Sequence, residues 1–333
     1  MTRASVWNLD AATYARHRLH GDACDWVEKN CYVDVWIEIL HAHRLDPMAM
    51  MPFTLAIDFE GDQWTFFKPS PADLADLYGI EVHELNVWRP LLAHATQHVG
   101  EGKLVLTEAD AYFLPDAAGT DYGTQHTKTT IGIETIDPDA RVLGYFHNAS
   151  YHTLRGADFD GLFGLGTPSD PRRLPLFAEI VRFDRVRRAS RFDLVGRSVE
   201  LLAHHLRRRP TTNPVVRFKP SFERELAKFA SDGLEYHAYA FATLRQVGAS
   251  FELASHYLRW LDHGFKDPPI VQAANAFADV SSTAKALVLK GARAVATKRF
   301  TDFSSMLDQM RDGWDLGMRL LERRFDVLVA AVG

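Results

Sequence analysis

The sequence predicts an α+β domain over residues 1–165, followed by an all-α helical domain over residues 176–333. Upstream of about residue 170, short apolar runs are separated by turn residues, which is typical of mixed helices and strands. Downstream, apolar residues recur almost continuously with helical spacing. The segment Gly161–Pro175, rich in glycine and proline, is expected to be the linker. A length of 333 residues with 47% hydrophobic residues also fits two globular domains.

The composition narrows the class of protein. No stretch approaches the ~20 apolar residues of a membrane helix, and the N-terminus lacks the apolar core of a signal peptide, so we expect a cytoplasmic protein without membrane association. The net charge of −5 gives no overall indication of nucleic acid binding. Only two cysteines occur, Cys24 and Cys31, which argues against a disulfide framework.

The first predicted helix begins beside a cysteine. Asn30 is a plausible N-cap, which places Cys31 in the first turn. Unpaired backbone N–H groups and the helix dipole favour a thiolate there, so Cys31 is a candidate nucleophile. No helix start lies beneath Cys24, which is expected to be structural. The apolar residues that recur at the spacing of one helix face are Val33, Trp36, Ile37 and Leu40.

A β-hairpin is the main predicted feature downstream of this helix. Beta-branched residues alternate over Thr127–Thr135, a turn follows at Asp137, and Val142–Phe146 returns as a second strand. The stretches Leu55–Phe59 and Trp64–Phe67 are either two strands or an irregular substrate loop. The other elements predicted in this domain are the helices Pro71–Tyr78, capped by Ser70, and Trp88–Val99, and the strand Lys103–Ala111.

About six helices are predicted in the C-terminal domain. They are separated by glycine and proline signals, and their aromatic faces are expected to form the core of a bundle. The predicted helices are Val195–Arg207, Ser221–Ser231, Tyr236–Gln246, Phe251–Leu261, Ile270–Ala296 and Phe303–Phe325.

Cys31 is followed along the chain by residues that could complete a catalytic triad. In Cys-His-Asn or Cys-His-Asp hydrolases a thiolate opens a helix, a strand carries the base, and the next strand orients the imidazole. His126 enters the predicted hairpin and Asn148 leaves it, and the hairpin returns residues about twenty apart alongside each other. Asn148 is preferred over its neighbour His147 because its amide oxygen can accept the imidazole N–H. Weaker candidates for the third position are Glu134 and Asp137.

The segments Glu108–Asp116, Asp121–His126 and Gly144–Asn148 follow one another in a recognisable order. This order resembles papain-like cysteine enzymes, among them the bacteriocin-leader-processing peptidases. It is closer to the N-terminal domain of the butirosin protein H family of acyltransferases. The resemblance covers about residues 20–155 and implies a papain-like cysteine-enzyme domain followed by the helical domain.

A second resemblance covers the whole chain. Its marks are Asp58–Gln63, Thr120–Tyr122, Tyr145–Ala149 and Tyr239–Gln246. With these segments the chain is similar to a proteobacterial uncharacterised family associated with amino acid:carrier-protein ligases. The resemblance implies an acidic acyl carrier protein as partner, such a ligase in the same pathway, and a phosphopantetheine arm as part of the substrate. It implies no directly bound cofactor.

The expected function is therefore thiol-dependent acyl transfer. An aminoacyl group would pass from the carrier-protein thioester to Cys31, with His126 as general base and acid and Asn148 orienting it. Papain-like enzymes usually carry a glutamine oxyanion donor six residues before the nucleophile, where this chain has Asp25, which cannot donate when ionised. Gln63 is the expected donor instead, with Asn30 or backbone N–H groups as alternatives. The alternative functions are a cysteine hydrolase (peptidase, amidase or thioesterase) with the same triad and a non-catalytic carrier-protein-binding protein.

Two further groups of side chains are predicted to contact substrate or partner. Acids beside apolar runs are expected to be partly buried and to pair with a cation, such as an aminoacyl ammonium group. The predicted substrate-binding residues are Asp58, Glu60, Glu108, Asp110 and Tyr122.

The partner surface is predicted from an uneven distribution of charge. Between Arg172 and Arg209 lie eleven arginines, no lysines and four acids. These arginines could dock an acidic carrier protein, or they could pair with acids of the chain or remain solvated. The expected docking residues are Arg182, Arg185, Arg187 and Arg188. No metal site is expected, because the histidine and cysteine spacings match no structural zinc pattern.

Overall fold

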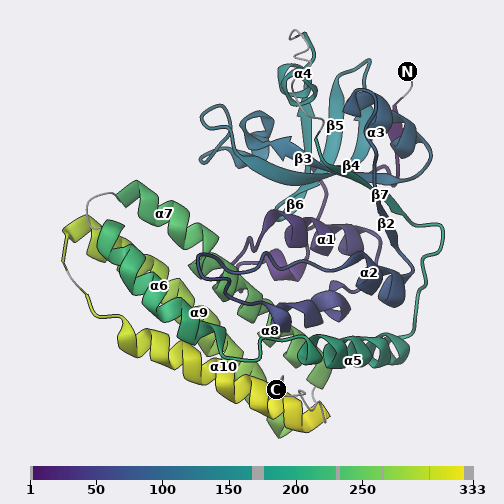
Figure 1. The fold of residues 1–333 in the computed structure, drawn as a ribbon. Helices are drawn as coiled ribbons and strands as arrows, with labels where there is room; N and C mark the ends of the chain where they lie inside the picture. The colour runs from purple at the N-terminus through teal and green to yellow at the C-terminus, as the bar shows by residue number, and fades with distance from the viewer. Residues whose placement is uncertain (1–2, 167–175, 230–232, 264–265, 300, 326–333) are drawn as a thin grey trace. The chain divides into compact units, whose positions relative to one another are not determined.

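The computed structural model describes residues 3–166, 176–229, 233–263, 266–299 and 301–325, and it shows a mixed α/β protein (Figure 1). The chain forms two compact units, which are described separately below. The sheet unit consists of residues 1–21, 30–47 and 70–188. The helical unit consists of residues 22–29, 48–69 and 189–333.

The sheet unit is built on antiparallel strands in the order β2-β7-β3-β4-β5-β6, with the short β1 paired to β4. The predicted hairpin is confirmed as β4 and β5, and the structure adds β6 as a third strand of the same meander. The strands are β1 (Ala4–Ser5), β2 (Glu81–Glu84), β3 (Leu104–Asp110), β4 (Lys128–Asp137), β5 (Val142–His147), β6 (Ser150–Arg155) and β7 (Ala178–Arg182).

Helices cover both faces of this sheet (Figure 1). On one face α1 packs closely against β4, because a side chain at Gly132 would meet Val35 of α1 at 3.3 Å. On the other face α3 and α4 enclose an apolar core that includes Ile131 and Ile133 of β4. The helices of this unit are α1 (Cys31–Ala42), α2 (Pro71–Tyr78), α3 (Leu91–Gly100) and α4 (Ala157–Phe163).

Short 3-10 helices connect several of these elements. The predicted pair of strands around Glu60 is one isolated bridge, Phe59 to Trp64, so the irregular-loop alternative is correct. The described 3-10 helices are η1 (Arg18–His20), η2 (Pro47–Ala56), η3 (Ala111–Phe113) and η4 (Pro115–Ala117).

The helical unit contains the six predicted helices, with shifted ends. Helix α8 packs along α9, and α9 packs along α10. The predicted helix Tyr236–Gln246 breaks at Thr243, and the predicted helix Ser221–Ser231 begins earlier and has its expected end outside the described residues. Its core is aromatic as predicted, since Tyr236, Phe251 and Tyr257 are fully buried. The helices are α5 (Arg191–Arg207), α6 (Pro214–Phe229), α7 (Gly233–Ala242), α8 (Leu244–Asp262), α9 (Pro268–Thr297) and α10 (Ser304–Phe325).

The boundary between the two units differs from the expected division into 1–165 and 176–333. Strand β7 lies beyond residue 165, the expected end of the first domain, and pairs with β2 and β3. The sheet unit therefore continues to Arg188. Part of the predicted linker Gly161–Pro175 belongs to α4, and residues 167–175 lie outside the described residues. Within the described residues, none of the helices combines the length and apolar character needed to span a bilayer.

Candidate functional site

Cys31 is the first residue of α1, as predicted. The Oδ1 atom of Asn30 accepts hydrogen bonds from the backbone N–H groups of Tyr32 at 3.1 Å and Val33 at 2.9 Å. The N–H of Asp34 donates to the Asn30 carbonyl. In the first turn of α1, the backbone N–H of Cys31 has no acceptor among the described residues. This N–H group is therefore able to donate to a ligand. Asn30 acts as the cap.

The thiol of Cys31 faces strand β4. Its Sγ atom lies 3.7 Å from the hydroxyl of Thr130, and the residue is half-buried. Gly132, two residues further along β4, faces Val35 of the same helix. Because strand side chains alternate between faces, Thr130 and Gly132 both lie on the face that α1 covers. Thr130 thus occupies the position opposite the thiol.

Two polar cross-strand pairs extend this face toward the end of β3. Thr130 is in register with Glu108, and Lys128 is in register with Asp110. Partners in register share a face, so all four side chains lie on the side of α1. The second pair is displaced by two residues from the first, which is about 7 Å along the strands. Lys128 Nζ donates to Glu108 Oε1 at 2.8 Å, so the cation that this acid binds is internal.

His126 is held by Asp110 at the end of this polar row. Its Nδ1 lies 2.6 Å from Oδ2 of Asp110, and its ring stacks on Tyr112 with 4.5 Å between centroids. The His126 side chain is 70% exposed, and its Nε2 has no hydrogen-bond partner in the part of the chain that the structure describes. The imidazole is therefore oriented by a carboxylate, with one nitrogen open to solvent. Asp110, which the sequence predicted to bind substrate, is the carboxylate that contacts this imidazole.

Asn148 is accounted for by the turn between β5 and β6. It is the first residue of a two-residue turn and takes a φ of 46°, a left-handed conformation that asparagine tolerates better than most residues. No hydrogen bond joins its side chain to His126 among the described residues. The structure brings Cys31 and His126 to one sheet face and assigns Asn148 a backbone role.

The neighbouring His147 takes part in a network that the sequence analysis did not identify. Its Nδ1 lies 2.6 Å from Asp116 Oδ2, and its Nε2 lies 2.8 Å from Thr129 Oγ1. Tyr145 donates to the other oxygen of Asp116 at 2.5 Å. Burial acts to raise the pKa of Asp116, but the hydrogen bonds and charge of His147 outweigh it, so the pKa is lowered. The His147 side chain is buried, with 2% exposed. The one sequence signal for this network was that His147 and Asn148 alternate along the strand, so that only one of them can face the Cys31 side.

The remaining predicted substrate residues are Tyr122, Asp58 and Glu60, and the first two have side-chain partners within their own units. In the sheet unit, the Tyr122 hydroxyl donates to Asp158 at 3.1 Å. In the helical unit, Asp58 forms an ion pair with Arg217, while Glu60 and Gln63 are exposed residues of one turn. The cation that binds Asp58 is therefore a residue of the chain itself.

The four predicted docking arginines all bind groups of the sheet unit. Arg182 and Arg185 form ion pairs with Glu81 at 3.3 and 2.9 Å, and Arg182 also pairs with Asp184. Arg187 donates to two carbonyls of α2, and Arg188 donates to the carbonyl of His43 just after α1. The last two therefore stabilise helix C-termini, where cations are favoured.

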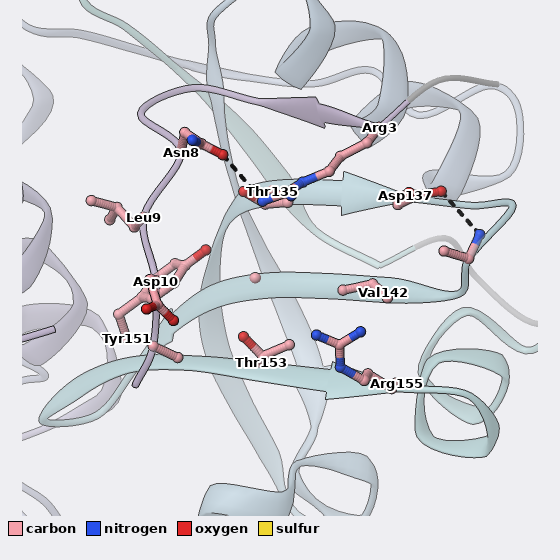
Figure 2. A pocket seen from close by; sticks show the side chains of 13 residues that line it. Arg3, Asn8, Leu9, Asp10, Thr135, Asp137, Val142, Tyr151, Thr153 and Arg155 are labelled. Atoms are coloured by element: carbon pink, nitrogen blue, oxygen red, sulfur yellow. Dashed lines mark hydrogen bonds between the residues drawn. The ribbon is translucent and has the colours of Figure 1, made fainter. Parts of the chain in front are cut away.

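A separate pocket of about 480 Å³ lies in the sheet unit, and Figure 2 shows its polar lining. Gly144 has no side chain there, and a Cβ at this position would collide with the hydroxyl of Tyr151. Arg3 reaches over the pocket and donates to Asn8 at 3.2 Å (Figure 2). Asp137, a weaker candidate for the third triad position, lines this pocket, and the residues Cys31, His126 and Asn148 do not. The lining residues include Arg3, Asn8, Asp10, Thr135, Tyr151 and Arg155.

Two family models match the chain. The DUF1839 N-terminal domain matches residues 15–183, and the DUF1839 C-terminal domain matches residues 192–323. The interval between the two matches contains Arg188, the last residue of the sheet unit. No curated protein matches the chain significantly.

Proposed function

The chain belongs to the DUF1839 family, and we propose that its sheet unit is a cysteine-dependent acyltransferase of papain-like architecture. The observation that carries the proposal is the placement of Cys31 and the His126–Asp110 pair on one face of the sheet. The papain-like assignment is supported by α1, which begins at a cysteine and packs on an antiparallel sheet.

Cys31 is the nucleophile of the proposed reaction. Its thiolate attacks the carbonyl carbon of an aminoacyl thioester, a new C–S bond forms, and the pantetheine sulfur leaves with a proton from His126. An amine then attacks the acyl group on Cys31, forming a C–N bond as the cysteine sulfur leaves, and His126 accepts the proton of the amine. Water in place of the amine gives hydrolysis.

Asp110 fixes the tautomer of His126 in this scheme. A carboxylate bound at Nδ1 keeps the proton on that nitrogen and leaves Nε2 as the base. Asp110, which holds the imidazole, lies two residues along β3 from Glu108, the register partner of Thr130. Direct proton exchange with Cys31 therefore requires the exposed imidazole to move toward α1. Binding of a substrate between the thiol and the imidazole would favour this approach.

The oxyanion of the reaction needs a hydrogen-bond donor. The backbone N–H of Cys31 is the donor that the sheet unit supplies, because Asn30 already binds the next three N–H groups. A backbone donor at this place removes the need for the glutamine that Asp25 replaces. Gln63, the donor expected from the sequence, belongs to the helical unit.

The acyl donor is proposed to be the phosphopantetheine thioester of an acidic carrier protein. This part of the proposal rests on the resemblance of the chain to proteins associated with amino acid:carrier-protein ligases. Arg185 is the docking residue that the geometry favours, because its side chain is 70% exposed while it forms a surface ion pair with Glu81. Arg187 and Arg188 are engaged with backbone carbonyls.

The proposed transfer is tested with an aminoacylated carrier protein. The full chain is incubated with the loaded carrier, with and without a panel of small amines, and the products are followed by mass spectrometry. Amide formation that requires Cys31 supports the transferase. Release of free amino acid at the same rate with and without amines identifies the hydrolase instead, and a Cys31→Ser variant as active as the parent contradicts both.

One observation favours a second function, that of a non-catalytic protein that binds the carrier protein. Thr130, which is not a base, occupies the position opposite the Cys31 thiol. In a binding protein, Cys31→Ser would leave carrier affinity and complex formation unchanged, and no acyl group would be found on the chain. These two readouts separate the second function from the first.

A further inference from the structure

Three side chains of different chemistry converge in the helical unit. They are Cys24, from the segment Asp22–Lys29, and Glu252 and His256, which lie four residues apart on one face of α8. One donor atom from each lies within 4.8 Å of the other two. Cys24 and Glu252 are buried, while His256 is only partly buried, so one side of the cluster is reachable from solvent.

The spacing of the donor atoms is close to what a tetrahedral zinc ion needs. Zn–S bonds of ~2.3 Å and Zn–N bonds of ~2.0–2.1 Å at a tetrahedral angle place the sulfur and nitrogen about 3.6 Å apart. The Sγ of Cys24 and the Nε2 of His256 are 3.8 Å apart. Small side-chain rotations would therefore bring both atoms to bonding distance. Thiolate, imidazole and carboxylate are the three ligand types that zinc takes in proteins.

The carboxylate of Glu252 is already oriented. Its Oε1 accepts the backbone N–H of Asp25 at 2.6 Å, and its Oε2 accepts that of Trp26 at 3.2 Å. Hydrogen bonds of this kind to a ligating carboxylate are usual in metal sites, and each oxygen keeps a lone pair for the ion. The same bonds hold the Cys24 segment against α8.

Packing beside the cluster fixes the segment further. The indole of Trp26 lies against Gly248 of α8, where a side chain would collide with it, and its N–H donates to Ser281 at 2.9 Å. The ammonium of Lys285 lies 4.4 Å from the centre of the Trp26 ring. The backbone that presents Cys24 is thus positioned without help from a metal, which lowers the cost of ordering the ligands.

We propose that Cys24, Glu252 and His256 bind a zinc ion. Three protein ligands leave the fourth tetrahedral position to water, which enters from the side of His256. Binding deprotonates the Cys24 thiol and ties the Asp22–Lys29 segment to α8. The ion stabilises the helical unit, because it joins Cys24 to two ligands of α8 that lie far away in the sequence.

The test uses the purified full chain, stripped of metal by a chelator and then loaded with Zn²⁺ or Co²⁺. About one zinc should be retained per chain after desalting, and Co²⁺ should give a thiolate-to-cobalt charge-transfer band together with tetrahedral d–d bands. Loading should also raise the melting temperature. The absence of both zinc and the charge-transfer band in the parent protein would overturn the proposal without any variant.

Matched variants assign the ligands. Cys24→Ser and His256→Ala should each lose the retained zinc, and Cys24→Ser should lose the charge-transfer band. Cys31→Ser, which removes the other cysteine, should keep both. Retention of zinc by Cys24→Ser and His256→Ala, or loss of the band in Cys31→Ser alone, would show that the metal binds elsewhere. Because these readouts do not involve acyl transfer, they are independent of the proposed function.

Discussion

His126 is bound through Nδ1 to the carboxylate of Asp110, with 2.6 Å between the two atoms, and its ring lies flat on Tyr112. A histidine held in this way has a defined tautomer and an available Nε2, which is the arrangement that a general base requires. Asn148, the residue expected to orient it, is instead a turn residue with positive φ. The two assignments for the third residue of the proposed triad, Asp110 and Asn148, make opposite predictions.

Replacing Asp110 with asparagine should slow acyl transfer by roughly 10²-fold or more, because the amide can stabilise the wrong imidazole tautomer. The measurement is the initial rate with an aminoacyl thioester at saturating substrate. Asn148→Gly is the matched control and should retain the parental rate. A normal rate in Asp110→Asn together with a large loss in Asn148→Gly would restore Asn148 as the orienting residue.

The backbone role of Asn148 predicts a stability pattern that does not depend on activity. Glycine adopts a φ near 46° without steric cost. The free energy of unfolding of Asn148→Gly should therefore differ from that of the parent by no more than about 0.5 kcal/mol. Asn148→Ile should lose on the order of 1–2 kcal/mol, because a β-branched residue is strained there. Urea denaturation measures both differences. Equal stability of the isoleucine and glycine variants would contradict this role.

Docking through Arg185 predicts a salt-dependent effect on one substrate only. Arg185→Glu should raise the KM for the loaded carrier protein at low ionic strength, and the difference should shrink as salt screens the contact. The KM for a small aminoacyl-pantetheine thioester should not change, and Arg185→Lys should behave like the parent. If Arg185→Glu and the parent have the same KM for the carrier at low salt, this arginine serves only its internal ion pair with Glu81.

His17 predicts how stability depends on pH. Burial is the largest cause that lowers its pKa, with the nearby His41 next, and the result is a pKa of about 3 against 6.5 in the unfolded chain. Below pH 6.5 the unfolded chain binds a proton that the folded one does not. The free energy of unfolding should therefore fall between pH 6.5 and 3 by about 1.4 kcal/mol per pH unit from this residue.

The variant His17→Asn isolates that contribution. Asparagine can accept the Leu19 N–H as His17 Nδ1 does at 3.2 Å, but it does not titrate. Urea denaturation at several pH values should give a shallower acid slope for the variant than for the parent. Identical slopes would show that His17 titrates alike in the folded and unfolded chains.

The sequence patterns that predicted correctly are local ones. The Asn30 cap, the helix that begins at Cys31 and the hairpin of β4 and β5 each depend on a few neighbouring residues whose spacing is set by backbone geometry. Strand β7 was missed because it has only five residues, two of them charged, and shows no clear alternation within an arginine-rich stretch. Its pairing with β2 and β3 depends on residues far away in the sequence.

The geometry of the proposed site followed from the sequence in part for the same reason. Cys31 was placed correctly at the start of α1, and His126 lies two residues before Lys128, the first residue of β4. The contact of His126 with Asp110 depends on the register of β3 and β4, which the sequence alone does not specify. From the sequence, Asn148, Glu134 and Asp137 were the candidates for the residue that orients His126. The His147–Asp116 contact and the Cys24–Glu252–His256 cluster likewise join residues that only tertiary packing brings together.

The most direct test of acyl transfer through Cys31 is the intact mass of the full chain after brief exposure to an aminoacyl-pantetheine thioester without an acceptor. The parent protein should gain the mass of one aminoacyl group, and peptide mapping should place it on Cys31. Cys31→Ala should gain nothing, and His126→Ala should gain it more slowly. An unmodified parent chain, or an adduct on Cys24, would contradict the proposed role of Cys31.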